Sequence, residues 1–431
     1  MISPDLLVMG GSAAVSAFTL WRWRRLDEGK QPEPVSAPVP VDLGPAAAIV
    51  TDSAQLALMW QAFKLGSWET GFPNVTAANL TESGMVVEVQ MLGGQSLKDW
   101  NNDATCDALA HYFAVPDVRV SSPAPGFVHL ELRTNDVLAA PAPVTDLLAY
   151  GVDLEAVPVG ITEDYDVWRL RVMYSHILIA GATESGKGSV LWSILNGLGP
   201  AIKAGLVDVL MGDPKGGMEF GRGEDRLFTD FQWTADGIIA MLTTAEAELQ
   251  ERAARFKAAR IRKYTPSVDE PLKVIIIDEY ASLSAFASKA QVAEALRLLG
   301  LILTQGRAVG YSVIVALQDP SKETMPNRQL FSVRVGLRFA EPSQTTMVLG
   351  DEAKPAGALC HHIPTTTPGV AYVGRDGSAD FVRVRAYWVD DDDADRIVEQ
   401  YSPAQPDFAP QADYSGFNPD DLGDEQGPLA A

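Results

Sequence analysis

The sequence predicts an α/β fold, in which a large region built on a parallel sheet follows a smaller α+β domain. Three observations support this prediction. An apolar strand, a glycine-bounded loop, a lysine and a helix pattern follow one another in residues 176–198. A second continuous apolar run, in residues 274–277, is typical of a central parallel strand, and two acidic residues follow it. Strand and helix patterns then alternate to about residue 389, which indicates a sheet covered by helices.

The loop from Gly181 to Lys187 has the sequence of a phosphate-binding P-loop. Backbone N–H groups of such a loop and the positive end of the following helix supply the donors that triphosphate oxygens need. Lys187 would place its charge on the β- and γ-phosphates. The alternative is a glycine-rich turn without a ligand. We expect ATP to be held by Gly181, Ala182, Thr183, Glu184, Ser185, Gly186, Lys187, Gly188 and Ser189.

The expected magnesium ligands include one departure from the P-loop pattern. The residue after the lysine is usually Ser or Thr, whose hydroxyl holds Mg²⁺, but here it is Gly188. The next hydroxyl belongs to Ser189, which we name as a candidate ligand. The acidic pair Asp278-Glu279 has the Walker B arrangement, in which Asp278 would help to hold Mg²⁺ and Glu279 would orient the attacking water. The alternative is a pair of carboxylates that caps a core strand.

Composition is typical of a globular protein of two domains with tails, since the chain has 431 residues and is 47% hydrophobic. Its two cysteines, Cys106 and Cys360, argue against a disulfide framework and fit a reducing cytoplasm. The cluster Cys360-His361-His362 has no second ligand cluster, so we expect a loop there rather than a metal site. The net charge of −22 does not by itself favour DNA as a partner, although a local basic surface remains compatible with it.

The N-terminus contains a candidate membrane anchor, residues 1–29. Leu6 to Trp21 is uncharged and mostly apolar, and three arginines follow it by residue 25. This order fits an anchor whose C-terminal side is cytoplasmic, whereas a signal peptide would carry its positive charge first. A frayed amphipathic helix is the alternative. Residues 30–45 contain five prolines and predict a semi-rigid linker. We therefore expect a cytoplasmic protein that associates with the membrane through its N-terminus.

Residues 46–138 are expected to form the small α+β domain. Periodic apolar residues predict two helices, and short apolar runs predict three strands. No catalytic cluster is visible in this part of the sequence, which favours a structural or docking role. The expected helices are Ser53–Leu65 and Leu97–Phe113, and the expected strands are Met85–Leu92, Val118–Val120 and Phe127–Arg133.

Residues 139–389 are expected to form the larger α/β domain. Besides the strands already named, Gly205–Gly212 reads as a strand that ends in Asp213-Pro214-Lys215-Gly216-Gly217. Ser312–Leu317 reads as a buried strand ending at Gln318, whose amide would either sense the γ-phosphate or simply bond to backbone. Ligands of open sheets bind outside the carboxyl ends of the strands, where these groups fall. Helices are expected at Thr234–Lys263 and Gln291–Thr304, and further strands at Ser332–Phe339, Gly369–Val373 and Phe381–Val389.

Two charged segments complete the chain. The end of the helix predicted at Thr234–Lys263 carries six basic residues, which fit either a solvated face matched to the helix dipole or a face that binds nucleic acid. Residues 390–431 contain twelve acidic residues and one basic residue, so they account for half of the net charge. We expect this acidic tail to be disordered.

Four motifs in this order resemble the FtsK/SpoIIIE family of DNA-pumping motors. The motifs are HILIAGATESGKGS, DPKGG, VIIIDE and GRAVGYSVIVALQDP, and the resemblance covers roughly residues 50–389. The sequence looks closest to the actinobacterial branch found on plasmids, integrated elements and phages. The resemblance implies a RecA-like P-loop NTPase motor that assembles as a hexameric ring around double-stranded DNA, with ATP and Mg²⁺ between subunits. A neighbouring subunit would then supply an arginine, for which Arg307 and Arg338 are the candidates.

The resemblance also implies a function, which is ATP-driven movement of double-stranded DNA in plasmid transfer or in chromosome or phage DNA movement. No helix-turn-helix pattern follows the motor, so we expect binding without sequence specificity. A protein-secretion ATPase of related fold is one alternative, although such proteins often carry several motors in tandem. A regulatory module with weak hydrolysis is another, suggested by Gly188 and opposed by the intact pair Asp278-Glu279.

Overall fold

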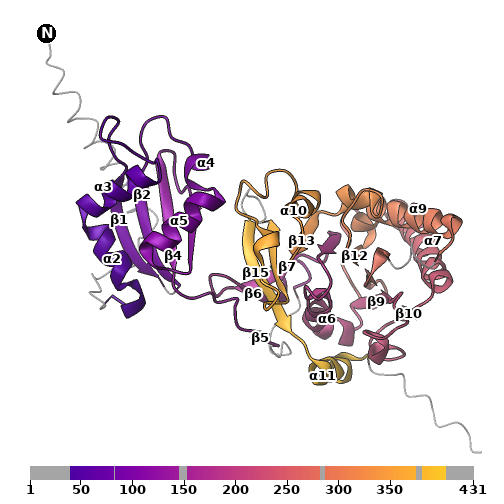
Figure 1. The fold of residues 1–431 in the computed structure, drawn as a ribbon. Helices are drawn as coiled ribbons and strands as arrows, with labels where there is room; N and C mark the ends of the chain where they lie inside the picture. The colour runs from indigo at the N-terminus through magenta and orange to yellow at the C-terminus, as the bar shows by residue number, and fades with distance from the viewer. Residues whose placement is uncertain (1–38, 82, 145–152, 282–286, 375–380, 404–431) are drawn as a thin grey trace, which may run out of the picture.

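The computed structural model describes residues 39–81, 83–144, 153–281, 287–374 and 381–403, which form two folded regions (Figure 1). The candidate membrane anchor, residues 1–29, and most of the predicted linker lie outside the described residues. Within the described part, no helix is both long enough and apolar enough to cross a bilayer.

The first region is a small α+β domain, as predicted. Its antiparallel sheet has the order β1-β2-β4-β3, and its core includes Trp60 and Trp100, whose rings meet edge to face at 5.2 Å. Instead of one helix over residues 97–113 there are two, because the Asn102 side chain accepts a hydrogen bond from the backbone of Thr105 and caps a new helix. The elements are α2 (Gly44–Thr51), α3 (Ser53–Ala62), β1 (Asn74–Thr81), β2 (Gly84–Gln90), α4 (Leu97–Trp100), α5 (Asp103–Phe113), β3 (Asp117–Ser121) and β4 (Phe127–Arg133).

The second region is built on an eleven-stranded sheet with the order β10-β9-β11-β12-β8-β13-β14-β15-β6-β7, in which β5 adds to β15. Strands β10 to β13 in this order run parallel, and the remaining strands of the path from β14 to β7 pair antiparallel. The strands are β5 (Ala142–Pro143), β6 (Val157–Thr162), β7 (Val167–Leu170), β8 (Ile177–Ala180), β9 (Val207–Gly212), β10 (Asp230–Gln232), β11 (Leu272–Ile277), β12 (Tyr311–Leu317), β13 (Val333–Leu337), β14 (Val370–Gly374) and β15 (Phe381–Trp388).

Helices cover both faces of this sheet, which explains why its central strands are apolar on both sides. Alternate residues of β8 face different cores: Ile177 and Ile179 pack with α6 and α11, and Leu178 and Ala180 pack with α7 and α9. The α/β fold expected from the sequence is therefore confirmed. The helices are α6 (Lys187–Lys203), α7 (Ala235–Ala259), α9 (Lys289–Gln305), α10 (Pro342–Leu349) and α11 (Asp391–Tyr401).

A buried carboxylate joins the two regions. Glu163, which directly follows β6, is only 6% exposed and pairs with Arg119 and Arg133 of the small domain. Its other oxygen accepts a hydrogen bond from the backbone of Arg383 on β15 at 3.1 Å. Burial raises the pKa of Glu163 and the two arginines oppose that effect. A charge that is buried with its partners on another domain favours one fixed arrangement of the two regions.

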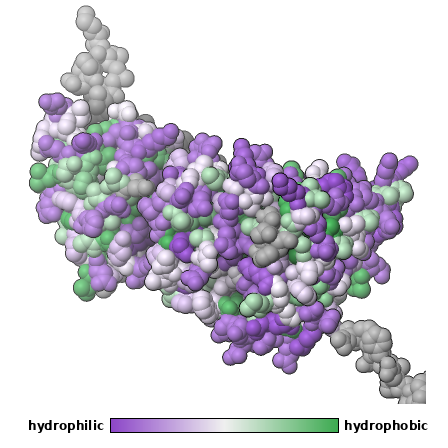
Figure 2. Space-filling view, turned by 45° about the vertical axis from the view of Figure 1, so that its right-hand side comes forward, coloured by the Kyte–Doolittle hydropathy of each residue, from purple (hydrophilic) through white to green (hydrophobic). Residues whose placement is uncertain are grey.

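Helix α11 corrects one sequence prediction, since residues 390–431 were expected to be disordered throughout. Ala394, Ile397, Val398 and Tyr401 lie at helical spacing and are buried, while the acidic residues of this helix face outward. The lower edge of the molecule, where Figure 1 places α11, is hydrophilic in Figure 2. The acidic composition masked this apolar stripe. Residues 404–431 lie outside the described part of the chain.

We predict that α11 is necessary for the stability of the motor. A Cβ at Gly199 on α6 would overlap the Tyr401 ring, so the two helices are in close contact. Ending the chain after Val389 should lower the melting temperature strongly, whereas ending it after Pro403 should leave it unchanged. Tyr401→Ala in the full chain should lower the free energy of unfolding by about 3–5 kcal/mol, which is typical of removing a buried aromatic ring. Equal thermal unfolding of both truncated chains would contradict this role.

A second prediction concerns His176, which anchors the start of β8. It is fully buried, and its Nδ1 accepts a hydrogen bond from the backbone of Val313 on β12 at 3.0 Å. Burial, and then the nearby charge of Arg307, lower the pKa of His176 to about 4. The unfolded chain binds this proton near pH 6.5, so this contribution to stability is complete above pH 6.5 and is lost as pH falls toward 4.

The measurement is urea unfolding of the wild type and of His176→Gln at pH 7.5 and pH 5. Between these two pH values, the free energy of unfolding of the wild type should fall by about 2 kcal/mol more than that of the variant. Only the wild type has this histidine to protonate. All other titrating groups are shared by the two proteins and cancel in the comparison. Equal losses would mean that His176 titrates normally in the folded protein.

Candidate nucleotide-binding site

Four parallel strands end together at one edge of the sheet and bring the predicted site residues close to one another. The pairing of β9, β11, β12 and β8 is in register, with Gly212 opposite Ile277 and Leu317 opposite Ala180. The residues that follow these strands are Asp213, Asp278, Gln318 and Gly181. The expectation that these groups share one edge is therefore confirmed.

The P-loop forms a cradle of backbone N–H groups between β8 and α6. Glu184 and Gly186 have positive φ values of 59° and 95°, the kind of turn from which neighbouring backbone N–H groups can form an anion-binding concavity. Gly186 must be glycine because a Cβ there would overlap the backbone of Gly369. The ammonium of Lys187, 7% exposed, donates to the carbonyls of Gly181 and Ala182 at 2.9 and 3.1 Å. Burial lowers the pKa of Lys187, and Glu279 is the main charge that opposes this effect.

Glu279 is fixed by one oxygen and leaves the other open. Its Oε1 accepts hydrogen bonds from the backbone of Gln318 at 3.3 Å and of Ala281 at 3.4 Å. Its Oε2 is buried and has no hydrogen-bond partner among the described residues. The Gln318 side chain accepts a hydrogen bond from the Thr183 hydroxyl at 2.9 Å, so β12 is joined directly to the P-loop. A free carboxylate oxygen beside a phosphate cradle can orient a water molecule.

Asp278 has the surroundings of a cation ligand. It is 1% exposed, and its Oδ2 accepts a hydrogen bond from the ammonium of Lys215 at 2.8 Å. Its Oδ1 has no hydrogen-bond partner in the described part of the chain. Burial raises the pKa of Asp278, and Lys215 is the main group that opposes this effect. The described residues contain no group of three potential metal ligands, but Mg²⁺ in nucleotide sites commonly takes only one or two protein carboxylates.

Sequence reasoning missed Glu219, which also belongs to this site. Its carboxylate lies against Gly188, because a Cβ at Gly188 would overlap its Oε1. Burial, and then the charge of Asp278, raise the pKa of Glu219 to about 7. The signal in the sequence was the DPKGG segment, which was predicted to lie at the end of a strand. No role was assigned to Glu219, which follows that segment. Glu219 and Ser189, the predicted magnesium ligand, both line one cavity of about 450 Å³.

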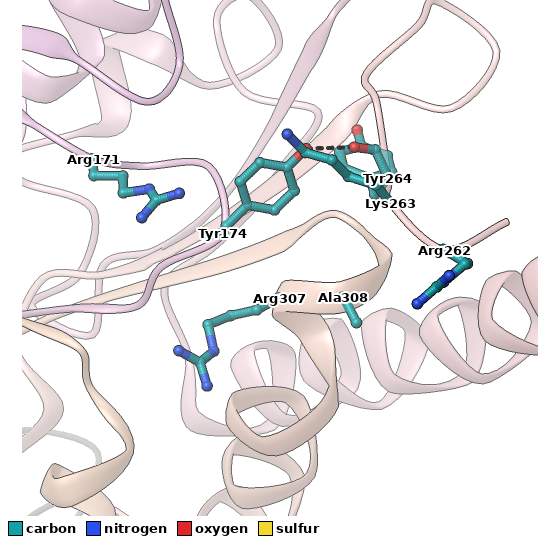
Figure 3. Close-up of a pocket in the computed structure, with 7 residues that line it drawn as sticks. All are labelled: Arg171, Tyr174, Arg262, Lys263, Tyr264, Arg307 and Ala308. Carbon is teal, nitrogen blue, oxygen red and sulfur yellow. Dashed lines mark hydrogen bonds between the residues drawn. The ribbon is translucent and has the colours of Figure 1, made fainter.

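The two arginines proposed to act between subunits lie in different places. Arg338 lies beside its own P-loop, where its guanidinium donates to the carbonyl of Thr183 at 2.8 Å. Arg307 lies in the turn η3 (Gly306–Val309) before β12, at the opposite edge of the sheet. There it lines a cavity of about 190 Å³ with Arg171, Arg262 and Lys263 (Figure 3). Within the described residues, Arg307 has no ion pair, so its charge is available to an external anion.

Comparisons with known proteins agree with this geometry. Residues 153–275 match the FtsK/SpoIIIE family model, and residues 48–134 match the model of the actinomycete conjugal transfer protein N-terminal domain. The chain is 28% identical over 359 residues to the transfer protein TraSA of Streptomyces ambofaciens, covering 78% of this chain and 83% of that protein. It is 27% identical over 339 residues to the DNA translocase FtsK of Bacillus cereus, covering 71% of this chain and 41% of that protein.

A solved structure supports the fold. The conjugation coupling protein TcpA of pCW3, in a monomer form with ATPγS, superposes with a TM-score of 0.53 at 18% identity, over 80% of this chain and 98% of that one. At this identity the likeness concerns the fold alone. The fold is that of a P-loop ATPase, and the resemblance predicted from the four motifs is confirmed. The chain therefore carries an FtsK/SpoIIIE family domain in its motor, preceded by an N-terminal domain of the actinomycete conjugal transfer type.

Proposed function

We propose that this protein is an ATP-driven translocase of double-stranded DNA, acting in plasmid transfer or in related movement of chromosomal or phage DNA. The family models and the likeness to a transfer protein over 83% of that protein's length support the assignment to DNA transfer. The FtsK relative supports translocation, although the chain spans only 41% of its length. The proposed substrate is duplex DNA, contacted through phosphates and therefore without sequence specificity.

The observation that carries the proposal is the half-free carboxylate of Glu279 beside the P-loop. Lys187 and the loop amides would bind the phosphates of ATP, and Asp278 would hold the accompanying Mg²⁺. The cation would supply charge neutralisation on the phosphate oxygens. Glu279 Oε2, buried and without a partner in the described residues, would orient water for attack on the γ-phosphate. Gln318, which contacts Thr183, would report the state of the nucleotide to β12.

The proposed assembly is a homo-oligomer, with a hexameric ring as its form. Arg307 lies at the N-terminal ends of the parallel strands, whereas its own P-loop lies at their C-terminal ends. It would therefore serve the nucleotide of a neighbouring subunit. Arg338 would act within its own subunit, because it already contacts Thr183. The exposed cations Arg262 and Lys263 would add positive charge at that interface. The proposal also includes membrane association through residues 1–29, which does not depend on the form of the assembly.

A third prediction tests hydrolysis and its dependence on DNA. The purified full chain should hydrolyse ATP faster with duplex DNA of several unrelated sequences, and DNA binding should weaken steeply with salt because counterions are released. Glu279→Gln should still bind ATP but lose at least about a hundredfold in turnover. Lys187→Ala should weaken nucleotide binding itself. Stimulation by an unfolded polypeptide and not by DNA would instead favour a protein-secretion ATPase.

A fourth prediction tests which arginine acts between subunits. Arg307→Ala alone should lose about 10³–10⁵ in turnover, the range found for arginine fingers. Mixing it with Lys187→Ala subunits should restore part of the activity, because some sites then combine an intact Lys187 with a neighbour's Arg307. Arg338→Ala is the matched control, since its defect lies in the same subunit as its P-loop and mixing should restore nothing. Restoration by Arg338→Ala and not by Arg307→Ala would reverse the two roles.

A further inference from the structure

The start of α6 lacks a hydroxyl where P-loops usually have one, and a carboxylate lies in the space that is left. The position after Lys187 is Gly188, although Ser or Thr commonly stands there and holds Mg²⁺. A Cβ at Gly188 would overlap Oε1 of Glu219. Glycine at this position therefore admits a side chain from another segment to the first turn of α6.

Two contacts hold Glu219 in this place. The carboxylate of Asp213, fully buried after β9, accepts hydrogen bonds from the backbone of Glu219 and of Phe220, each at 3.2 Å. The ring of Phe220 is buried and stacks on Trp192 with 5.1 Å between centroids. Trp192 lies four residues after Gly188 and so shares its face of α6. The same contacts that bury Phe220 thus set Glu219 beside Gly188.

The surroundings of Glu219 also contain a buried acidic oxygen that is open to a cation. Lys215 and Glu219 line the same cavity, and the ammonium of Lys215 reaches the Asp278 carboxylate at 2.8 Å, so both carboxylates lie close to one lysine. Asp278 is 1% exposed, and its Oδ1 has no hydrogen-bond partner in the described part of the chain. The ammonium of Lys215 already rests on Oδ2 of Asp278, so this carboxylate accepts a positive charge. Across the described ranges, Glu219 makes no ion pair.

We propose that Glu219 replaces the missing P-loop hydroxyl and, together with Asp278, holds the divalent cation that accompanies the nucleotide. This inference rests on the nucleotide site of the proposed function. Two carboxylates with phosphate oxygens and water match the ligands that Mg²⁺ prefers. Ser189 is the competing ligand, since it lines the same cavity as Glu219.

The test measures how strongly Mg²⁺ tightens binding of mant-ATPγS, a fluorescent nucleotide that is hydrolysed slowly. The dissociation constant of the full chain is determined with saturating Mg²⁺ and with EDTA, and their ratio reports the metal contribution. Glu219→Gln should reduce this ratio at least about tenfold, as expected when a group that determines metal affinity is removed. Its binding in EDTA should stay near the wild-type value, which also shows that the site remains folded. Ser189→Ala tests the competing ligand directly, and it should lower the ratio less than Glu219→Gln does.

A compensating pair sharpens the test. Gly188→Ser combined with Glu219→Ala should recover most of the ratio, because the serine side chain enters the space that the carboxylate leaves. An unchanged ratio in Glu219→Gln, with a loss in Ser189→Ala, would overturn the proposal and assign the cation to the hydroxyl. Binding of nucleotide by the wild type in EDTA, without any tightening by Mg²⁺, would overturn the metal role alone. Failure of the wild type to bind nucleotide under either condition would overturn the proposed function as well.

Discussion

The parallel register of β9, β11, β12 and β8 is the constraint on which the candidate site depends. Each of these strands is short and buried on both faces, so a slip by one residue would move apolar side chains to the wrong core. His176 reinforces the register by holding the backbone of β12 at the start of β8. Since the strands end together, the phosphate loop, the acidic pair and Gln318 meet without any long loop to position them.

The candidate site combines side chains held by hydrogen bonds with carboxylate oxygens that have no partner among the described residues. One oxygen of Glu279 is tied to the backbone after β12, and the other has no partner among the described residues. The bond from Thr183 to Gln318 joins the P-loop to the same strand. A change at the phosphates can therefore reach β12 through side chains that are already in contact. Because η3 precedes that strand, the segment that carries Arg307 is continuous with the strand whose end contacts the P-loop.

Local patterns in the sequence were enough to predict the strand ends and the P-loop, because both depend on short-range constraints. The apolar runs, the glycines and Asp278-Glu279 each report a local requirement of the backbone or of the phosphates. Strand β1 was not predicted, since most of its residues are exposed and its apolar residues form no continuous run. Helix α11 was masked by its aspartates, although its buried residues follow helical spacing. In both cases composition concealed a pattern that tertiary packing decides.

Glu219 shows a different limit, because nothing in its neighbourhood in sequence indicates contact with Gly188. The contact depends on Asp213, which gathers the backbone after β9, and on the packing of Phe220 against Trp192. The two candidate arginines show the same limit, since the sequence does not distinguish Arg307 from Arg338, whereas in the fold Arg307 lies before β12 and Arg338 contacts the P-loop. Residues that act through a tertiary contact can be recognised only when the packing that creates the contact is known.

The segment after β9 also balances the charge that Glu219 brings. A carboxylate in place of a hydroxyl adds a negative charge beside Asp278, and two neighbouring carboxylates repel each other. The same segment supplies Lys215, whose ammonium reaches Asp278 at 2.8 Å. Gly216 and Gly217 have φ values of 83° and 74°, which reverse the chain between the lysine and the glutamate. One short turn thus delivers the extra acid together with its counterion, so glycine at position 188 and the DPKGG sequence become parts of a single electrostatic arrangement.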